Sequence, residues 1–336
     1  MAKVAINGFG RIGRATFKIL MDTPELEVMA VNDLVPIENL AYMLKFDSVY
    51  GRYERDVKPG PEGLIVDGKS VRVLAEKDPA KLPWRDMEID VAFECTGRFT
   101  DKEGLLKHIE AGAKNVILSA PSKSPDIGTV VHGVNKPDEE ARAISCASCT
   151  TNSITPVIEI IGRRIGIKKA IMTTVHAYTS TQALVDGPST KFRRGRAAGV
   201  NIVPTSTGAA IATTKALPQY EGKFDGMAFR VPVPVGSISD ITLLVERPTT
   251  REEIKNIFRE EAGTDRYRNV VAASEDPLVS TDIIKDPHAA VIDLEMIKVV
   301  DGDLVKIMSW YDNEWGYSNQ MVREALEMAK MKEVGV

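Results

Sequence analysis

In the first half of the chain, short runs of β-branched and apolar residues alternate with longer stretches in which apolar residues recur at helical spacing. This alternation predicts strands joined by helices. The expected strands are Lys3–Asn7, Glu27–Asn32, Val71–Ala75, Val91–Cys95, Asn115–Leu118 and Ala143–Ser145, and the expected helices are Arg11–Met21 and Lys102–Ala111. Such β-α-β alternation implies an α/β fold with a parallel, doubly wound sheet of the Rossmann type.

The pattern changes near Ile171, where strand-like runs succeed one another with little helix between them. The expected strands are Ala170–Val175, Met227–Val231, Ser239–Val245, Ala290–Leu294 and Leu304–Trp310, and helical patterns cover Ile154–Ile165 and Thr250–Glu261. We therefore expect an α+β second domain around a mostly antiparallel sheet. Residues Ser318–Lys332 predict an amphipathic helix that packs back onto the first domain.

The composition supports two folded domains and excludes several classes of protein. The chain has 336 residues, of which 43% are hydrophobic and 27% charged, and about 100–200 residues make one domain. No apolar run approaches the roughly 18 residues of a membrane span, and a net charge of −4 disfavours nucleic acid as a partner. Three cysteines form no disulfide framework, which suits a reducing compartment. We expect a cytoplasmic protein without a metal site, a nucleic-acid partner or a membrane partner.

A glycine-rich segment at the N-terminus predicts a dinucleotide site. Gly8, Gly10 and Gly13 follow an expected strand and open a helix, the context in which G-x-G-x-x-G holds a pyrophosphate. The first glycine makes the tight turn, the second lets the backbone approach the phosphates, and the third allows close helix–strand packing. Asp33, about 20 residues further on, is placed to bind a ribose 2′-hydroxyl. Its carboxylate favours NAD over NADP without excluding NADP.

A candidate nucleophile stands where the two halves of the pattern meet. Cys149 lies between an expected strand and a helical pattern, where the positive end of a helix dipole lowers the pKa of a thiol. Ser148 and Thr150 supply neighbouring hydroxyls. His176 ends a strand-like run among small polar residues and is the candidate base that a thiol nucleophile needs. Cys95, within an apolar run, is expected to be an inert core residue.

Two further segments indicate binding of anions. The basic cluster Arg193–Arg196 precedes Pro204–Ala210, whose hydroxyls and glycine are suited to cradle an oxyanion. Arg230 stands inside an otherwise apolar run, which favours a role in binding a partner group. The cluster at Arg193–Arg196 can equally form a solvated basic face.

Taken together, these segments resemble phosphorylating glyceraldehyde-3-phosphate dehydrogenase. The matching motifs are Ile6–Arg14, Ala147–Asn152, His176–Thr179, Asp186–Ser189, Ser206–Ala210 and Ser309–Ser318. They occur in the family's order from the first strand to the last helix. The resemblance implies NAD-dependent oxidative phosphorylation of D-glyceraldehyde 3-phosphate to 1,3-bisphosphoglycerate through a cysteine thiohemiacetal and a thioester.

The resemblance also implies roles for individual residues. Cys149 would be the nucleophile and His176 its base. The substrate phosphate would bind Thr179 and Arg230, and the attacking inorganic phosphate would bind Ser148, Thr150, Arg194, Thr207 and Gly208. Contacts with NAD would come from Arg11, Ile12, Asp33, Thr96, Ser119 and Asn313, in addition to the three glycines. The implied division is a dinucleotide-binding domain of residues 1–148 and 313–336 and a catalytic domain of residues 149–312, in a homotetramer whose loop between His176 and Pro204 reaches a neighbouring cofactor site.

Some residues depart from the family pattern and keep alternatives open. Cys146 stands where the family usually has Asn, Ser153 where it commonly has a second Cys, and Lys77 where Arg is frequent. Erythrose-4-phosphate dehydrogenase shares most of the motifs and is the nearest alternative. A thiol redox function of the C-x-x-C segment formed by Cys146 and Cys149 is a remote one, and it leaves the hypothesis that Cys146 captures an oxidised Cys149 as a disulfide. That disulfide is forbidden if both side chains diverge from one helix.

Overall fold

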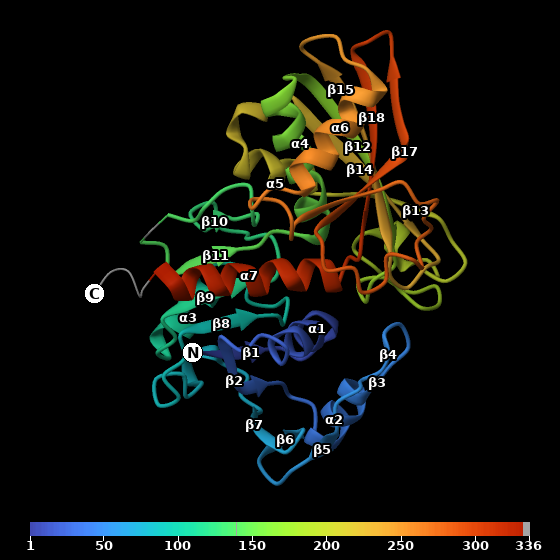
Figure 1. Ribbon diagram of the computed structural model, residues 1–336. Coiled ribbons are helices and arrows are strands. Elements are labelled where there is room, and N and C mark those ends of the chain that lie inside the picture. Colours follow the sequence, from blue (N-terminus) through green and yellow to red (C-terminus); the bar gives the residue numbers. More distant parts are fainter. Residues whose placement is uncertain (139, 332–336) are drawn as a thin grey trace. The chain divides into compact units, whose positions relative to one another are not determined.

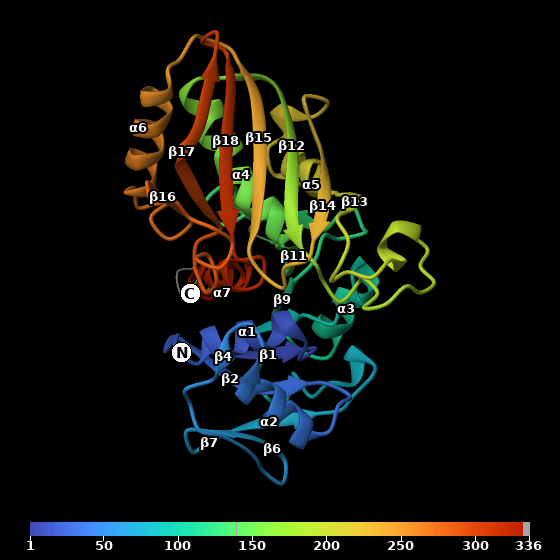
Figure 2. The same cartoon turned by 90° about the vertical axis from the view of Figure 1, so that its right-hand side faces the viewer.

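The computed structural model describes residues 1–138 and 140–331, which form two compact units. Unit 1 holds the described residues within 1–130, 137–147 and 318–331, and unit 2 holds residues 131–136 and 148–317. Figures 1 and 2 show their elements from two directions. Within the described part of the chain, no helix combines the length and apolarity that a membrane crossing requires.

A nine-stranded sheet forms the centre of unit 1. Its order is β10-β11-β9-β8-β1-β2-β7-β6-β5. The strands are β1 (Ala2–Asn7), β2 (Leu26–Asn32), β5 (Val57–Pro59), β6 (Gly63–Val66), β7 (Lys69–Leu74), β8 (Val91–Glu94), β9 (Asn115–Leu118), β10 (Gly128–Thr129) and β11 (Ala143–Ser145), and β3 (Phe46–Asp47) pairs with β4 (Gly51–Arg52) alone. Strands β10 to β7 run parallel, which confirms the predicted doubly wound sheet, and β6 and β5 extend it antiparallel.

The helices of unit 1 begin where the sequence predicts, with two differences. They are α1 (Arg11–Leu20), α2 (Ile37–Lys45), α3 (Lys102–Glu110) and α7 (Trp315–Met331), with a 3₁₀ turn at Pro79–Lys81. The pattern did not predict α2, and α7 begins three residues earlier than expected. From Ser318 onward α7 belongs to unit 1, whereas Lys332, the last residue of the predicted helix, lies outside the described residues. Strands β8 and β9 are wholly buried, as expected for a parallel sheet covered on both faces.

Unit 2 is built on a second sheet of seven strands. Its order is β13-β14-β12-β15-β18-β17-β16. The strands are β12 (Ile167–Ala177), β13 (Val203–Ser206), β14 (Phe224–Val231), β15 (Ser237–Val245), β16 (Val271–Ser274), β17 (Ala290–Val300) and β18 (Leu304–Tyr311). Only β12–β14 and β16–β17 are parallel pairs, so the prediction of a mostly antiparallel sheet is confirmed.

Three helices cover one face of this sheet, which Figure 2 shows broadside. They are α4 (Cys149–Arg164), α5 (Ala209–Ala216) and α6 (Arg251–Ala262), with 3₁₀ turns at Phe192–Gly195 and Pro218–Tyr220. Strand β15 alternates strictly between buried and half-buried residues, and its buried Ile241 and Leu243 share a core with Ile158 of α4. Helix α4 starts earlier than its apolar pattern because the Ser148 hydroxyl accepts a hydrogen bond from Thr151 N at 3.1 Å and caps the first turn.

A cluster of ion pairs holds the C-terminal half of α4. Arg163 Nη2 donates to Glu261 Oε2 of α6 at 2.9 Å, and its Nε donates to Glu159 Oε1 at 2.9 Å. Glu159 also accepts from Arg266 Nη1 at 3.0 Å and from the Tyr267 hydroxyl at 2.6 Å. Because both carboxylates are largely buried, these pairs fix α4 against α6 and the segment that follows α6.

Candidate active site and cofactor pocket

A pocket of about 530 Å³ opens at the carboxyl ends of the parallel strands of unit 1. In open α/β sheets this is the edge at which ligands bind. The lining residues come from the segments that follow β1, β2, β7 and β8, and are Asn7, Gly8, Gly10, Asn32, Asp33, Leu34, Val35, Glu76, Lys77, Cys95, Thr96, Arg98 and Phe99. The pocket therefore joins the glycine segment, the acidic residue and Thr96, three features that the sequence assigned to cofactor binding.

The three glycines have the surroundings that a dinucleotide cradle requires. Gly8 has φ +94°, and a Cβ there would meet Thr96 N at 2.6 Å. A Cβ on Gly13 would meet Gly8 O at 2.0 Å, so only glycine permits this approach of helix to strand. Nothing lies within 4 Å of the corresponding position at Gly10, and no side chain caps α1. The open space before an uncapped helix start fits a bound pyrophosphate.

The acidic residue at the pocket is held by the main chain. Asp33 Oδ2 accepts from Phe9 N at 2.7 Å, and Oδ1 accepts from Val35 N at 3.2 Å. A carboxylate has further lone pairs, so Asp33 can still accept from a ribose hydroxyl. The Arg11 guanidinium pairs with Asp47 at 2.6 Å, which directs this side chain toward the segment after α2. Any contact of Arg11 with a cofactor phosphate would come from its main chain.

Of the other residues predicted to contact NAD, only Thr96 lines the pocket, and Asn313 belongs to the other unit. Thr96 lines the pocket, whereas Ile12 and Ser119 are absent from its lining. Asn313 belongs to unit 2, where its Oδ1 accepts from Ser237 Oγ at 3.1 Å and from Gly236 N at 3.2 Å. The roles of these residues stay predictions.

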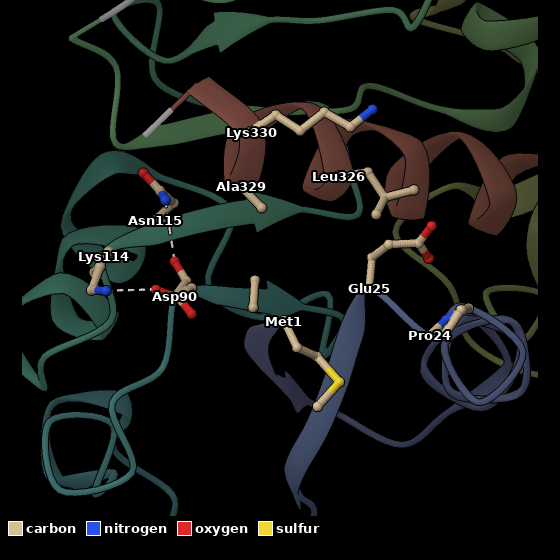
Figure 3. A pocket seen from close by; sticks show the side chains of 10 residues that line it. Met1, Pro24, Glu25, Asp90, Lys114, Asn115, Leu326, Ala329 and Lys330 are labelled. Carbon is tan, nitrogen blue, oxygen red and sulfur yellow. Dashed lines mark hydrogen bonds and ion pairs between the residues drawn. The ribbon is translucent and has the colours of Figure 1, made fainter. Parts of the chain in front are cut away.

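A second pocket of about 530 Å³ in unit 1 contains none of the predicted site residues (Figure 3). Met1, Leu326 and Ala329 contribute apolar surface, and Asp90 Oδ1 pairs with Lys114 Nζ at 2.6 Å across its wall. Charged and polar side chains also line this pocket, namely Glu25, Asp90, Lys114, Asn115 and Lys330, but the predicted nucleophile and base belong to unit 2.

In unit 2, the structure brings the predicted nucleophile and base together. Cys149 is the first residue of α4, and His176 is the penultimate residue of β12. Cys149 Sγ lies 3.3 Å from His176 Nε2, within hydrogen-bonding distance for sulfur. A thiol nucleophile with an imidazole in contact is the arrangement that covalent catalysis requires.

Arg230 completes this cluster from the neighbouring strand. It lies opposite His176 in the parallel pairing of β12 with β14. Arg230 Nη1 is 2.7 Å from His176 Nδ1 and donates to Ala177 O at 2.8 Å, while Nδ1 itself lies 2.6 Å from Ala177 O. If Nδ1 carries the proton it donates to Ala177 O, and Nε2 can accept a proton from Cys149. If Nδ1 accepts from Arg230, Nε2 carries the proton instead.

Electrostatics keeps both partners neutral in this arrangement. Burial, and then the positive charge of Arg230, lower the pKa of His176 to about 3. Burial raises the pKa of the Cys149 thiol, against the lowering effects of Arg230 and of hydrogen bonds with Thr150. The prediction that the helix start lowers this thiol pKa is therefore wrong in its net direction, because desolvation outweighs the favourable dipole.

The structure distinguishes the three arginines of the basic cluster. Arg194 is half-buried, and its Nε donates to Thr205 Oγ1 at 3.1 Å. Its charge helps lower the pKa values of His176 and Arg230, so it lies in their electrostatic neighbourhood. Arg196 pairs with Asp186 at 2.7 Å, and both Arg193 and Arg196 are exposed. Among these three arginines, only Arg194 affects the pKa values of His176 and Arg230.

The predicted hydroxyl and glycine contacts are distributed around the same unit. Thr179 Oγ1 lies 2.9 Å from Thr181 Oγ1, and Thr207 Oγ1 accepts from Ala209 N at 3.2 Å. Gly208 precedes α5, with nothing within 4 Å of its Cβ position. Both Thr179 and Thr207 are half-buried.

Sequence reasoning missed Tyr311, which lies beneath the nucleophile. Its hydroxyl is 2.9 Å from Thr150 Oγ1 and 2.7 Å from Thr174 Oγ1, and its ring stands edge-on to His176 at 6.0 Å. Thr150 is consequently buried, with its hydroxyl engaged by protein. Tyr311 lies inside the last matching motif, so the signal was present but gave no chemical reason to choose this ring.

The two remaining cysteines lie in different environments, and only Cys95 differs from its predicted position. Cys95 is half-buried and lines the cofactor pocket, so its placement in the core was wrong; burial, and then the neighbouring Glu94, raise its pKa to about 12. Cys146 is a buried residue of unit 1, whereas α4 begins at Cys149 in unit 2. The two cysteines therefore do not share a helix. Burial, followed by Glu324 and Cys95, raises the pKa of Cys146 well above its usual range, which keeps this thiol protonated.

Comparisons with known proteins cover almost the whole chain. Residues 2–102 match the family model described as the NAD binding domain of glyceraldehyde 3-phosphate dehydrogenase, and residues 148–313 match its C-terminal domain. Glyceraldehyde-3-phosphate dehydrogenase 2 of Bacillus subtilis is 46% identical over 323 residues, covering 95% of this chain and 94% of the relative. The enzyme of Geobacillus stearothermophilus is 46% identical over 330 residues, covering 97% and 98%, and that of Zymomonas mobilis is 43% identical over 332 residues, covering 98% of each.

Proposed function

The chain belongs to the glyceraldehyde-3-phosphate dehydrogenase family, and we propose that it converts D-glyceraldehyde 3-phosphate, NAD and inorganic phosphate into 1,3-bisphosphoglycerate. The observation that carries the proposal is the 3.3 Å contact between Cys149 Sγ and His176 Nε2 at the start of α4. A cysteine suits this reaction because its thioester retains the energy of oxidation in a bond that phosphate can attack.

We propose that unit 1, within a cofactor domain of residues 1–148 and 313–336, holds NAD. The fit rests on the open space at Gly10, the close packing at Gly8 and Gly13, and the position of Asp33 at the same pocket. Arg11, Ile12, Thr96, Ser119 and Asn313 are the further proposed contacts. Bound NAD supplies the acceptor for the hydride that leaves the substrate carbon.

In the first step, Cys149 Sγ forms a bond to the aldehyde carbon while its proton passes to His176 Nε2. The thiol cannot remain protonated as it attacks, and His176 is the base within reach. The imidazolium returns that proton to the carbonyl oxygen as the thiohemiacetal forms, and the imidazole takes it back from this oxygen as the hydride leaves and the thioester carbonyl forms. This role requires the tautomer in which Nδ1 donates to Ala177 O.

The substrate phosphate would favour that tautomer. Arg230 Nη1 lies 2.7 Å from His176 Nδ1, and its positive charge, after burial, lowers the pKa of the imidazole. A phosphate bound by Arg230 and Thr179 neutralises this charge and draws the guanidinium's hydrogen bonds toward itself. The pKa of His176 then rises toward its usual range, and its Nε2 becomes a better base.

In the last step, inorganic phosphate attacks the thioester carbon, the carbon–sulfur bond breaks, and Cys149 leaves as the thiolate. Ser148, Thr150, Arg194, Thr207 and Gly208 are the proposed phosphate site. The half-buried position of Arg194 and its electrostatic influence on His176 support it over Arg193 and Arg196. Thr150, whose hydroxyl contacts Tyr311, would contribute chiefly through its main-chain N–H in the first turn of α4.

We further propose that the protein is a cytoplasmic homotetramer. The loop between His176 and Pro204 exposes several large apolar side chains, namely Leu184, Val185, Phe192, Val200 and Ile202. An exposed apolar set on one loop is typical of a surface that a second subunit covers. Sedimentation across a range of concentrations tests the assembly, and a monomer at every concentration would contradict it.

The requirement for phosphate tests the reaction itself. Steady-state turnover with D-glyceraldehyde 3-phosphate is expected to depend on inorganic phosphate and to yield an acyl phosphate that hydroxylamine traps. Erythrose 4-phosphate is the control substrate and is expected to react more slowly. Turnover that is unchanged without phosphate, together with a preference for erythrose 4-phosphate, would replace this proposal by erythrose-4-phosphate dehydrogenase.

A further inference from the structure

A fully buried carboxylate lies at the end of β8, directly before the part of the cofactor pocket that contains Cys95 and Thr96. Glu94 has no exposed surface, and its strand is otherwise apolar. A buried carboxylate is costly unless hydrogen bonds replace its water. Its presence here therefore requires a set of donors.

Glu94 receives four donors, two at each oxygen. Oε2 accepts from Asn7 Nδ2 at 2.6 Å and from His108 Nε2 at 3.1 Å. Oε1 accepts from Thr96 N at 2.8 Å and from the Thr96 hydroxyl. Thr96 Oγ1 in turn accepts from Arg98 N at 3.0 Å. Glu94 thus sets the conformation of residues 95–98, of which Cys95, Thr96 and Arg98 line the pocket.

The protonation pattern of this network is fixed by an indole. Trp84 Nε1 can only donate, and it lies 3.0 Å from His108 Nδ1. Nδ1 must therefore accept, which leaves the proton on Nε2, where it is donated to Glu94. Both Trp84 and His108 are fully buried, so no water competes for these bonds.

From Asn7, the hydrogen-bond network continues across the carboxyl ends of β1, β2 and β7. Asn7 Oδ1 accepts from Asn32 Nδ2 at 2.7 Å. Asn32 then bonds the main chain of Glu76 twice, donating to its O at 2.8 Å and accepting from its N at 2.8 Å. Asn7, Asn32, Glu76 and Thr96 all line the pocket and come from the ends of four adjacent strands, β8, β1, β2 and β7.

We propose that Glu94 is a positioning residue for NAD, which holds the strand-end segments that follow β8, β1, β2 and β7 at the spacing the dinucleotide requires. This inference rests on the proposed binding of NAD by unit 1. The spacing is tight, because an added Cβ on Gly8 would meet Thr96 N at 2.6 Å. A site that is ordered before the ligand arrives loses less conformational freedom on binding, and therefore binds more tightly.

Glu94→Gln tests the proposal with almost no change of shape. The new amide NH₂ must face either Thr96 N–H or the paired donors of Asn7 and His108, so at least one donor loses its acceptor. The Kd of NAD, measured by isothermal titration calorimetry, is expected to rise by about tenfold. The rate at which iodoacetamide alkylates Cys149 and the KM for the aldehyde are expected to stay within about twofold of wild type, since neither depends on the spacing of these strand ends.

Glu261→Gln is the matched control, since it makes the same change at a buried carboxylate of unit 2 that holds Arg163 and Arg164. It is expected to lower the unfolding temperature while the Kd of NAD stays within about twofold of wild type. If Glu94→Gln lowers the unfolding temperature to a similar extent without changing the Kd of NAD, Glu94 is a structural residue only and the proposal is overturned. Because NAD binding is measured without substrate, this result would leave the proposed reaction untouched.

Trp84→Phe provides a second variant if Glu94→Gln does not fold. It leaves Glu94 and the whole pocket lining in place and removes only the N–H that fixes the tautomer of His108. The Kd of NAD is expected to rise about two- to fivefold, with the KM for the aldehyde unchanged. A Kd of NAD equal to that of wild type in this folded variant would overturn the proposal by itself.

Discussion

The two polar centres of the molecule satisfy their hydrogen bonds differently. Around Glu94, each donor meets an acceptor, and an indole assigns the proton of the only imidazole. Around His176, by contrast, Arg230 and Ala177 O compete for one ring nitrogen, and Arg230 Nε is buried with no partner among the described residues. The first centre is complete without a ligand, whereas the second lacks an acceptor.

This difference matches the chemistry proposed for each unit. A cofactor that must bind in one orientation benefits from a preformed pocket. A site that must move a proton during each turnover needs groups whose hydrogen bonds can change. If Arg230 binds the substrate phosphate as proposed, its unpaired Nε is a donor for that anion, and binding of substrate would also activate the base.

The largest expected effect is a loss of catalysis that leaves the binding of NAD unchanged. Cys149→Ser replaces the thiol by a hydroxyl, which is a far weaker nucleophile, and the kcat for oxidation is expected to fall by more than about 10³-fold. NAD affinity in calorimetry is expected to stay within about threefold of wild type. A large loss of NAD affinity in this variant would show that the centres are not independent.

The second largest expected effect is the loss of kcat/KM when the positive charge of Arg230 beside His176 is removed. Arg230→Gln is expected to lower kcat/KM for the phosphorylated aldehyde by about 10²-fold, the value of one or two charge-assisted hydrogen bonds. Arg196→Gln, which removes an exposed arginine already paired with Asp186, serves as the control and is expected to change kcat/KM by less than about twofold. Equal losses in both variants would contradict a specific role of Arg230.

The pH dependence of thiol reactivity sharpens the description of the catalytic centre. Because burial raises the pKa of Cys149, its alkylation by iodoacetamide without substrate is expected to increase with pH and to reach half its maximum above the usual thiol value of about 8.5. The pKa of His176 is about 3, so no inflection is expected between pH 5 and 8, in wild type or in His176→Asn. An inflection near pH 6 in wild type that disappears in His176→Asn would mean that the thiolate–imidazolium pair already exists without substrate.

The smallest effect concerns the extra thiol. Cys146 is buried in unit 1 and its pKa is raised, so it is a poor partner for an oxidised Cys149. After peroxide treatment, Cys146→Ala and wild type are expected to recover activity with dithiothreitol to within about twofold of each other. Recovery that fails only in the variant would restore the hypothesis of a protective disulfide.

The features that the sequence predicted are those that depend on residues close together along the chain. The glycine fingerprint predicted the first turn of α1, and the strand-like run Ser239–Val245 predicted most of β15. Cys149 and His176 were predicted because the former precedes a helical pattern and the latter ends a strand-like run, and the resemblance to the family then favoured His176 as the base. Segments of two to four residues, such as β3 and β4, carry too few positions for a period to be visible.

What the sequence could not give depends on distant residues. The direction of the Cys149 pKa shift follows from burial, which α4, β12 and β14 create together. The hydrogen bonds of Glu94 come from Asn7, which lies 87 residues away along the chain, and from His108, which lies 14 residues away. A carboxylate within an apolar strand was nevertheless a visible signal, because such a residue is buried only with partners.

The ion-pair cluster around Glu159 and Glu261 anchors the C-terminal end of α4, the end opposite the nucleophile. Cys149 occupies one end of this 16-residue helix and Arg163 and Arg164 the other, about 22 Å apart at roughly 1.5 Å per residue. A tilt of about 5° at the anchored end would displace the nucleophile by about 2 Å, and a displacement of about 1 Å can cost a hundredfold in rate. Substitutions at this distant anchor can therefore slow the reaction mechanically, without altering any group that touches the substrate.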